Sequence, residues 1–144
     1  MKTQSIMLDL KKTNKKILNM LATRYKKMKL DITPNQSKIL MFIHEKKEVT
    51  SNEIGKYIHV NKSSLSKVLN NLEKNKYIVR IEDEKDTRKK IIKLTSKSNK
   101  IVDILEKDAE EVSKLLMIGI KKEEYETFKK VLDKVEMNIE RDNL

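Results

Sequence analysis

Apolar residues recur along most of the chain at the spacing of amphipathic helices. From Met7 to Met28 they keep this spacing with lysines between them, which predicts one long helix. The pattern returns from Ile101 to Leu116 and from Tyr125 to Ile139, which predicts two more long helices near the end of the chain. Most of the chain is therefore expected to be helical.

Capping residues mark the starts of three shorter helices in the middle of the chain. Thr33-Pro-Asn-Gln is a capping box with proline at the first helical position, and Thr50-Ser-Asn-Glu is a second capping box. Asn61 can cap a further helix, whose apolar positions from Leu65 to Leu72 follow the spacing i, i+3, i+4 and i+7. About three residues join the last two of these helices, and so short a connection is typical of a helix-turn-helix.

Two short β-branched runs follow the helix-turn-helix. Ile78–Ile81 and Ile91–Leu94 flank a highly charged stretch, Glu82–Lys90, which predicts a hairpin with a long tip. The expected fold is therefore mainly α with a small β-hairpin, in a single domain of residues 1–144.

The charge of the chain points to the class of partner. Lys and Arg number 33 against 22 Asp and Glu, so the net charge is +11. Such an excess favours polyanionic partners, with nucleic acid ahead of a membrane surface. Residues 1–35 and 61–100 each carry a net charge of +7, whereas residues 101–144 carry −4. This distribution suggests that the two ends attract each other and that the middle faces an external anion.

Several classes of protein are disfavoured by the residues that the chain lacks. Without cysteine it has no disulfide or thiolate metal site, which suits a reducing cytoplasm. The longest apolar run, Leu115–Ile120, is too short to cross a bilayer, so we expect no membrane association through a spanning helix. No glycine-rich phosphate loop and no catalytic Ser/His/Asp order is present, so we expect neither a cofactor nor an enzyme. A zinc sensor would have to use His44, Glu45, Glu48 and His59, but a helix surface and a turn explain the two histidines better.

The helix predicted after Asn61 has two unlike faces. Its leucines fall on one side of a helical wheel, and hydroxyl, amide and lysine side chains fall on the other. A helix fits the major groove of DNA, where such groups can meet base edges. The candidates for DNA contact on this face are Lys62, Ser63, Ser64, Ser66, Lys67 and Asn70. The alternative is an ordinary solvated helix surface, but the capped helix before it and the hairpin after it favour DNA binding.

The start of the preceding helix adds two candidates. Thr50 and Ser51 stand at a helix N-terminus, where backbone N–H groups attract phosphate. Their capping role alone explains them equally well.

The hairpin tip adds further basic candidates. Lys85, Arg88 and Lys89 lie in it, and an arginine on such a tip can enter an adjacent minor groove, which makes Arg88 the strongest of the three. We expect Asp86 to orient Arg88 or to close the turn by a hydrogen bond. The alternative is an exposed ion pair of little energetic value.

Six motifs occur in an order that resembles a known family. They are Thr33-Pro-Asn-Gln, Val49-Thr-Ser-Asn-Glu-Ile, Asn61-Lys-Ser-Ser-Leu-Ser-Lys, Leu72-Glu-Lys-Asn-Lys-Tyr-Ile-Val-Arg80, Asp86-Thr-Arg88 and Leu94-Thr95. Together they resemble the multiple antibiotic resistance regulator (MarR) family of bacterial winged helix-turn-helix transcription factors, over nearly the whole chain. Lys76 and Ser98 stand where such proteins usually carry glycine, so we expect local differences at the end of one helix and the start of the next.

The resemblance implies both an architecture and a function. A winged helix-turn-helix DNA-binding module would span residues 33–97, and residues 1–32 and 98–144 would form dimerisation helices. A homodimer would bind double-stranded DNA at a pseudo-palindromic operator, and such regulators are often repressors relieved by a small ligand. The sequence assigns no ligand pocket. The alternative from another class is a winged-helix module that binds an acidic protein partner.

Overall fold

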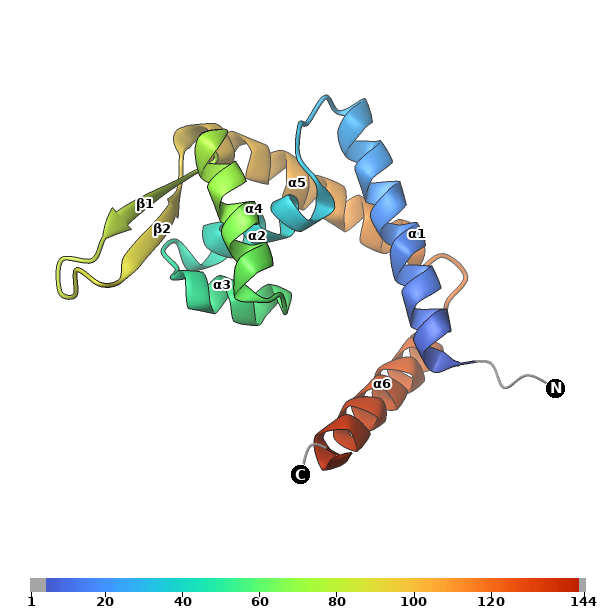
Figure 1. Ribbon diagram of the computed structural model, residues 1–144. Helices are drawn as coiled ribbons and strands as arrows, with labels where there is room; N and C mark the ends of the chain where they lie inside the picture. Colours follow the sequence, from blue (N-terminus) through green and yellow to red (C-terminus); the bar gives the residue numbers. More distant parts are fainter. Residues whose placement is uncertain (1–4, 143–144) are drawn as a thin grey trace. The chain divides into compact units, whose positions relative to one another are not determined.

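The computed structural model describes residues 5–142, which form helices and one two-stranded sheet (Figure 1). In chain order the elements are α1 (Ile6–Lys27), α2 (Pro34–Lys46), α3 (Ser51–Ile58), α4 (Lys62–Lys74), β1 (Ile78–Glu82), β2 (Lys90–Leu94), α5 (Ser96–Leu116) and α6 (Lys122–Asp142). The chain packs as two compact units, one up to residue 107 and one from residue 108, and α5 contributes to both. The prediction of a mainly α fold with one small hairpin is confirmed.

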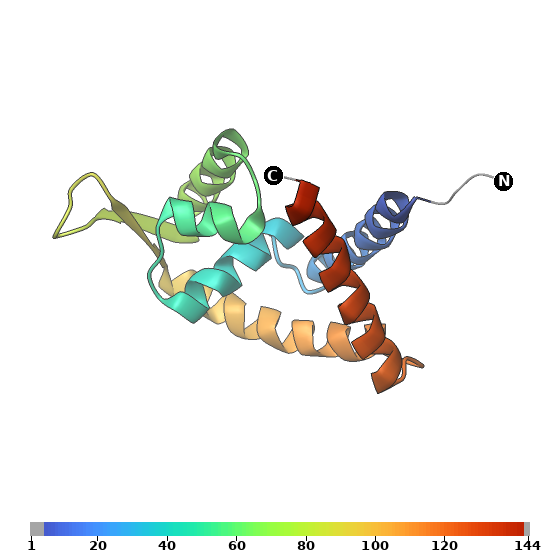
Figure 2. The ribbon, with the colours of Figure 1, turned by 90° about the horizontal axis from the view of Figure 1, so that it is seen from below.

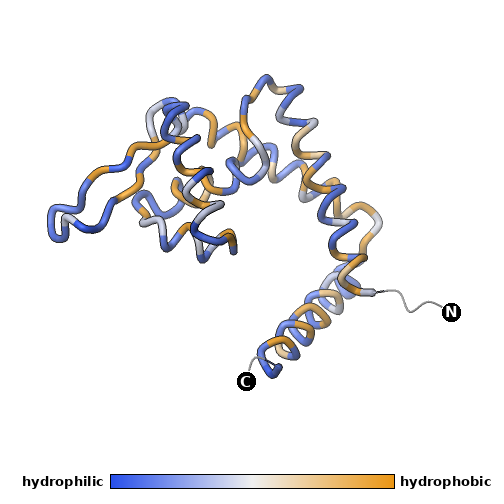
Figure 3. Tube along the Cα trace, viewed as in Figure 1, coloured by the Kyte–Doolittle hydropathy of each residue, from blue (hydrophilic) through white to orange (hydrophobic). Residues whose placement is uncertain are grey.

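The core of the first unit lies where the apolar faces of α2, α3, α4 and the hairpin meet. The hydropathy of the trace alternates along these elements, as expected for segments that bury one face (Figure 3). The side chains that are at most 1% exposed include Ile39, Leu40, Ile43, Ile54, Leu72, Ile78 and Ile92. Burial of each such side chain stabilises the fold by about 1.5–3 kcal/mol. The cluster therefore fixes α4 against both α2 and the hairpin.

The hairpin is attached to the helix-turn-helix at its base. Its strands pair antiparallel, from Ile78 opposite Leu94 to Glu82 opposite Lys90, so each strand is one residue longer than predicted. Between α2 and α3, the N–H of Val49 donates to the carbonyl of Ile92 at 3.2 Å and the carbonyl of Val49 accepts from the N–H of Ile92 at 2.7 Å. The tip extends away from the helices of the same unit (Figure 2).

Side-chain caps begin the three short helices. At α2 the predicted capping box is confirmed: Thr33 Oγ1 accepts from the N–H of Gln36 at 3.1 Å, and Gln36 Oε1 accepts from the N–H of Thr33 at 2.9 Å. The prediction of a second complete box at α3 is wrong. Thr50 Oγ1 does accept from the N–H of Glu53 at 3.3 Å, but the Glu53 carboxylate accepts from the Thr50 hydroxyl at 3.2 Å instead of from its backbone. A hydroxyl beside a carboxylate offers it a closer donor than the backbone does.

The end of α4 keeps the geometry that glycine usually supplies. Lys76 has a φ of 62°, its N–H donates to the carbonyl of Glu73 at 3.0 Å, and the N–H of Tyr77 donates to the carbonyl of Leu72 at 2.9 Å. These bonds form a Schellman motif. The expected change in local structure is therefore wrong for the backbone, because lysine adopts the left-handed conformation itself, at a cost of about 1–2 kcal/mol.

Ser98 replaces the second expected glycine with a hydrogen bond. Its side chain is fully buried, and its hydroxyl donates to the carbonyl of Tyr77 at 2.6 Å. The Tyr77 hydroxyl donates in turn to the backbone carbonyl of Asp31 at 3.1 Å. Burial, and after it the Asp31 carboxylate, raise the pKa of Tyr77, so the hydroxyl remains protonated and able to donate. The start of α5 is thereby tied to the end of α4 and to the segment after α1.

The second unit contains the last part of α5, a turn and α6. Gly119 lies in the turn with a φ of 77°, a conformation that glycine adopts without strain. No described residue of α6 is buried. Apolar side chains on one face of this helix are 43–56% exposed: Tyr125, Phe128, Val131 and Ile139. An apolar stripe of this kind is normally covered by another element.

Candidate nucleic-acid interface

The exposed face of α4 carries all six candidates that the sequence placed on it. Asn61 begins the helix, with its Oδ1 accepting from the N–H of Ser64 at 2.8 Å. Leu65, Leu69 and Leu72 are buried and anchor the opposite face. The exposed candidates are Lys62, Ser63, Ser64, Ser66, Lys67 and Asn70. We call this set the α4 face. It contains cations and hydrogen-bonding groups, which is the chemistry that a DNA groove requires, and the exposed carboxylate of Glu73 follows it in the last turn of α4.

α3 packs closely against α4 and sets its position. Ile54 is fully buried in the core, and a Cβ at Gly55 would lie 3.2 Å from Leu65 Cδ2. Glycine at this position therefore lets the two helices approach closely. His59 ends α3 in the left-handed conformation, with its N–H donating to the carbonyl of Gly55 at 3.0 Å. The two capped helices and their short turn form the predicted helix-turn-helix.

A polar cavity joins the start of α3 to the hairpin. It has a volume of about 360 Å³ and is lined by Thr50, Ser51, Asn52, Glu53, Arg88, Lys89 and Lys90. We call it the α3–hairpin cavity. Three basic residues, the acidic Glu53 and a helix N-terminus border it, and the basic residues and the helix N-terminus attract anions. The structure thus brings together four predicted candidates from two separate parts of the sequence, two from each.

Two aspartates shape the hairpin tip. Asp86 Oδ1 accepts from the N–H of Arg88 at 3.1 Å and lies 3.6 Å from Arg88 Nε, so the carboxylate both closes the turn and faces the guanidinium. The Arg88 side chain is nevertheless 94% exposed. Asp83 makes the equivalent turn contact, accepting from the N–H of Lys85 at 3.1 Å. The two carboxylates therefore hold the backbone of the tip, while the Arg88 side chain extends into solvent.

Lys85 does not join the other basic residues of the tip. It is exposed, but it lines a separate groove that also contains the acidic residues Glu48, Glu82, Asp83 and Glu84. The two sides of the hairpin tip therefore differ in charge. Sequence position alone did not distinguish Lys85 from Lys89, because a loop without regular periodicity does not determine which way its side chains face.

Arg80 of β1 is a contact residue that the sequence analysis did not single out. Its Nη2 donates to Asn70 Oδ1 at 2.6 Å, and its Nε lies 3.4 Å from Glu73 Oε2. The strand alternation gave a signal, because Arg80 shares a face with the buried Ile78 and pairs with the buried Ile92. A charged side chain on a core face requires a partner, and α4 provides it.

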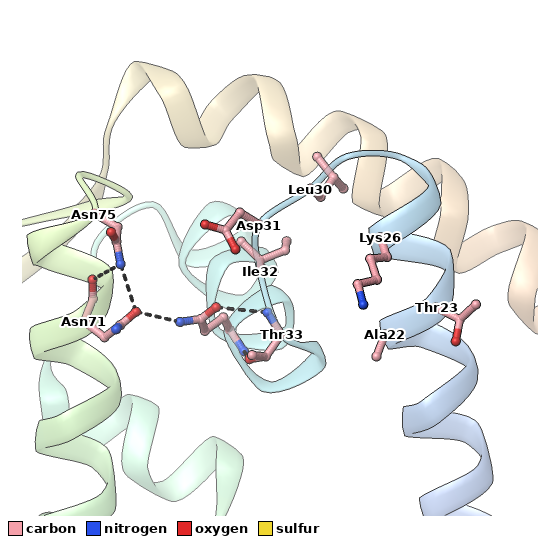
Figure 4. Close-up of a pocket in the computed structure, with 10 residues that line it drawn as sticks. Ala22, Thr23, Lys26, Leu30, Asp31, Ile32, Thr33, Asn71 and Asn75 are labelled. Atoms are coloured by element: carbon pink, nitrogen blue, oxygen red, sulfur yellow. Dashed lines mark hydrogen bonds between the residues drawn. The ribbon is translucent and has the colours of Figure 1, made fainter.

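A second cavity lies at the C-terminal end of α4. It has a volume of about 590 Å³ and is lined by residues of α1, α2, α4 and the segment between α1 and α2 (Figure 4). Along one side, Gln36 Nε2 donates to Asn71 Oδ1 at 2.9 Å, and Asn75 Nδ2 donates to the same oxygen at 3.0 Å. These amides join the start of α2 to the last turns of α4, so both ends of α4 are held in the unit.

The residues proposed for a zinc site do not gather. His44 in α2 lies 3.9 Å from Glu106 in α5, whereas His59 ends α3. Within residues 5–142, no group of three or more His, Asp or Glu side chains could hold a metal ion. Over the same residues, no helix is both long and apolar enough to span a bilayer.

Comparisons with known proteins agree with this arrangement. Residues 30–89 match the family model of the MarR family, and this stretch contains α2, α3, α4, β1 and most of the hairpin tip. An uncharacterized HTH-type transcriptional regulator of Bacillus subtilis, YybA, is 28% identical over 113 residues, which are 78% of this chain and 75% of that protein.

Solved structures extend the similarity to nearly the whole chain. The MepR protein of S. aureus, in a complex with DNA, has a TM-score of 0.86 and 25% sequence identity, covering 94% of this chain and 99% of its own. The FabT protein of Streptococcus pneumoniae, also in complex with DNA, has a TM-score of 0.78 and 23% identity, covering 94% and 96%. The fold is thus shared over both the helix-turn-helix and the terminal helices.

Proposed function

We propose that the chain is a transcriptional regulator of the MarR family, which binds specific sequences of double-stranded DNA as a homodimer and represses transcription until a small ligand releases it. The observation that carries the proposal is the α4 face, which is exposed and offers lysines, hydroxyls and an amide, together with the α3–hairpin cavity of the same unit, which three basic residues border. Members of this family are regulators and not enzymes.

In this proposal α4 is the recognition helix. Its N-terminal half enters the major groove, where Ser63, Ser66 and Lys67 meet base edges. Lys62 and Ser64, next to the cap, lie where a helix start meets the DNA backbone. The dense row of phosphates supplies much of the affinity, so a net charge of +11 speeds association and makes it depend on salt.

The α3–hairpin cavity is proposed to hold a phosphate of the same duplex. The N–H groups at the start of α3, together with Thr50, Ser51 and Lys89, provide donors and positive charge around it. Arg88 then extends along the minor groove, where negative potential attracts a guanidinium, and Asp86 sets its direction.

Dimer formation is proposed to use the terminal helices, residues 1–32 and 98–144, around the DNA-binding module of residues 33–97. The exposed apolar stripe of α6 supports this, because a second copy would cover it. A twofold dimer places two copies of α4 about one helical turn of DNA apart, which requires a pseudo-palindromic operator. A dimer on a promoter blocks transcription by occupying the DNA, and a small ligand that changes the spacing of the two modules would release it.

The test is recovery of the DNA that the protein holds in cells. The full chain is crosslinked, purified with and without nuclease, and the bound fragments are sequenced. The expected result is enrichment of sites that share a pseudo-palindrome, with loss of co-purifying material after nuclease. Fragments without a shared sequence, together with a stoichiometric acidic protein that survives nuclease, would contradict the proposal and favour a protein-interaction module.

A further inference from the structure

Arg80 contacts two side chains of α4 at once. Its Nη2 donates to Asn70 Oδ1 at 2.6 Å, and its Nε lies 3.4 Å from Glu73 Oε2. Asn70 and Glu73 are three positions apart on α4, so both are within reach of one guanidinium. Only 19% of the Arg80 side chain is exposed, whereas Asn70 belongs to the exposed α4 face. Arg80, a residue of the hairpin, thus holds the side-chain amide of Asn70 on the α4 face.

The surroundings of Arg80 keep the guanidinium in place. Its backbone is held by strand pairing with Ile92, whose side chain is fully buried. The Glu73 carboxylate is 46% exposed, and an ion pair of that kind is weak by itself. The short charge-assisted hydrogen bond to Asn70 is the stronger contact. The backbone of Arg80 is therefore fixed by the sheet, and its guanidinium meets the Asn70 amide from that position.

This contact determines which way the Asn70 amide faces. A guanidinium has only donors, so the atom that meets it must be the carbonyl oxygen of the amide. The amide nitrogen, with its two hydrogens, is then directed away from Arg80. An asparagine without such a partner can turn either its oxygen or its nitrogen toward a ligand.

We propose that Arg80 is a positioning residue for sequence recognition, which makes Asn70 a hydrogen-bond donor on the α4 face. The inference rests on the proposed function of α4 as the recognition helix. In the major groove, a donor matches N7 and O6 of guanine, N7 of adenine and O4 of thymine. It opposes cytosine, whose N4 group is itself a donor. The hairpin therefore contributes to base preference at one position of each half-site through a residue that touches no base.

The experiment measures the base preference of the full chain by selection from a randomised duplex library followed by sequencing. Arg80→Met keeps the length of the side chain but has no donor, and Arg80→Lys keeps one donor for the amide. Asn70→Asp retains the contact with Arg80 and removes the donor hydrogens. Lys93→Met is the matched control. It removes a paired cation from the neighbouring strand, since Lys93 Nζ lies 3.0 Å from Glu48 Oε1, but it does not affect Asn70. Thermal unfolding of each variant reports whether it folds.

The inference predicts a change at one base pair of each half-site. A single hydrogen bond contributes about threefold to tenfold in affinity. In Arg80→Met the discrimination against cytosine at that position should fall by this factor, while the other positions keep their preference. Arg80→Lys should retain most of the discrimination, Asn70→Asp should shift it toward cytosine, and Lys93→Met should leave it unchanged.

Two results would overturn the inference while leaving the proposed function intact. One is that Arg80→Met lowers affinity for all sequences equally. The other is that Asn70→Asp, which does not depend on the stability of the Arg80 variant, selects the same sequences as the unaltered protein. If the unaltered protein selects no sequence at all, the proposed function itself fails and the inference fails with it.

Discussion

At the scale of single residues, the charge of the candidate interface is set by a few local contacts. On α4 the exposed Glu73 carboxylate pairs with Arg80, and in the hairpin tip Arg88 is directed by Asp86. The sequence predicted the residues of the α4 face because helical periodicity decides which positions of α4 face solvent. It did not predict that Lys85 lies apart from Lys89, or that Arg80 meets Asn70, because both depend on how a hairpin and a helix pack in three dimensions.

Lys67 and Arg88 are expected to affect DNA binding in different ways. Lys67→Ala removes a major-groove contact, so affinity for the operator should fall by about tenfold and base preference should relax. Arg88→Ala removes a minor-groove contact and should weaken binding by a similar factor with base preference kept. Fluorescence anisotropy on operator and scrambled duplexes measures both effects. Lys100→Ala, at an exposed α5 position, is the control for loss of one charge. If all three variants had the same affinities for the two duplexes, Lys67 and Arg88 would be ordinary solvent-exposed side chains without a specific DNA contact.

Glu53 is expected to weaken DNA binding in the unaltered protein. It lines the α3–hairpin cavity, where its carboxylate would repel a phosphate. Glu53→Gln keeps an oxygen that can accept from Thr50 and removes the charge, so affinity should rise by about fivefold at low salt. Titration of a labelled operator measures the change, with Glu45→Gln on the surface of α2 as the matched control. An unchanged or lower affinity of Glu53→Gln alone would argue against a phosphate in this cavity.

At the scale of elements, helix starts were more predictable than helix ends. Thr33, Thr50 and Asn61 all begin helices as predicted, because a capping residue acts on N–H groups within its own first turn. The ends of α1 to α4 are each followed or closed by a residue at positive φ that is not glycine, so the usual sequence signal for a helix end is missing. The start of α5 at Ser96 was missed, although it carries a local signal, since Thr95 Oγ1 accepts from the N–H of Ser98 at 3.4 Å.

At the strained end of α4, replacing lysine by glycine is expected to change the free energy of unfolding in opposite directions at two nearby positions. Lys76→Gly removes the cost of a left-handed lysine and should raise the free energy of unfolding by about 1 kcal/mol. Lys74→Gly, in the last helical turn, should lower it by about 0.5–1 kcal/mol. Urea denaturation measures both values. If both variants were destabilised, the left-handed geometry at Lys76 would not be a source of strain.

At the scale of the whole molecule, the account joins a DNA-binding module to helices that need a partner. The basic charge lies in residues 1–35 and 61–100, and α6 leaves an apolar stripe exposed. The sequence predicted the helices and their apolar periodicity. It did not reveal that the single chain leaves α6 without a buried residue, because periodicity shows that a face is apolar and not what covers it.

The dimer is expected to fail when the stripe of α6 is charged. Phe128→Glu places a carboxylate among exposed apolar side chains, so sedimentation should show a monomer. Operator affinity should then fall by about a hundredfold, because the two modules no longer bind together. Thr127→Glu adds the same charge on an adjacent position and should remain dimeric. A dimeric Phe128→Glu with full operator affinity would place the interface elsewhere.

The most direct measurement of the central claim is the affinity of the unaltered protein for a selected operator and for a scrambled duplex of equal length, across a series of salt concentrations. The account predicts that the operator binds about a thousandfold tighter, or more, and that both affinities fall steeply as salt increases. Equal affinity for the two duplexes, or binding that is insensitive to salt, would contradict sequence-specific recognition by a basic helix in the major groove.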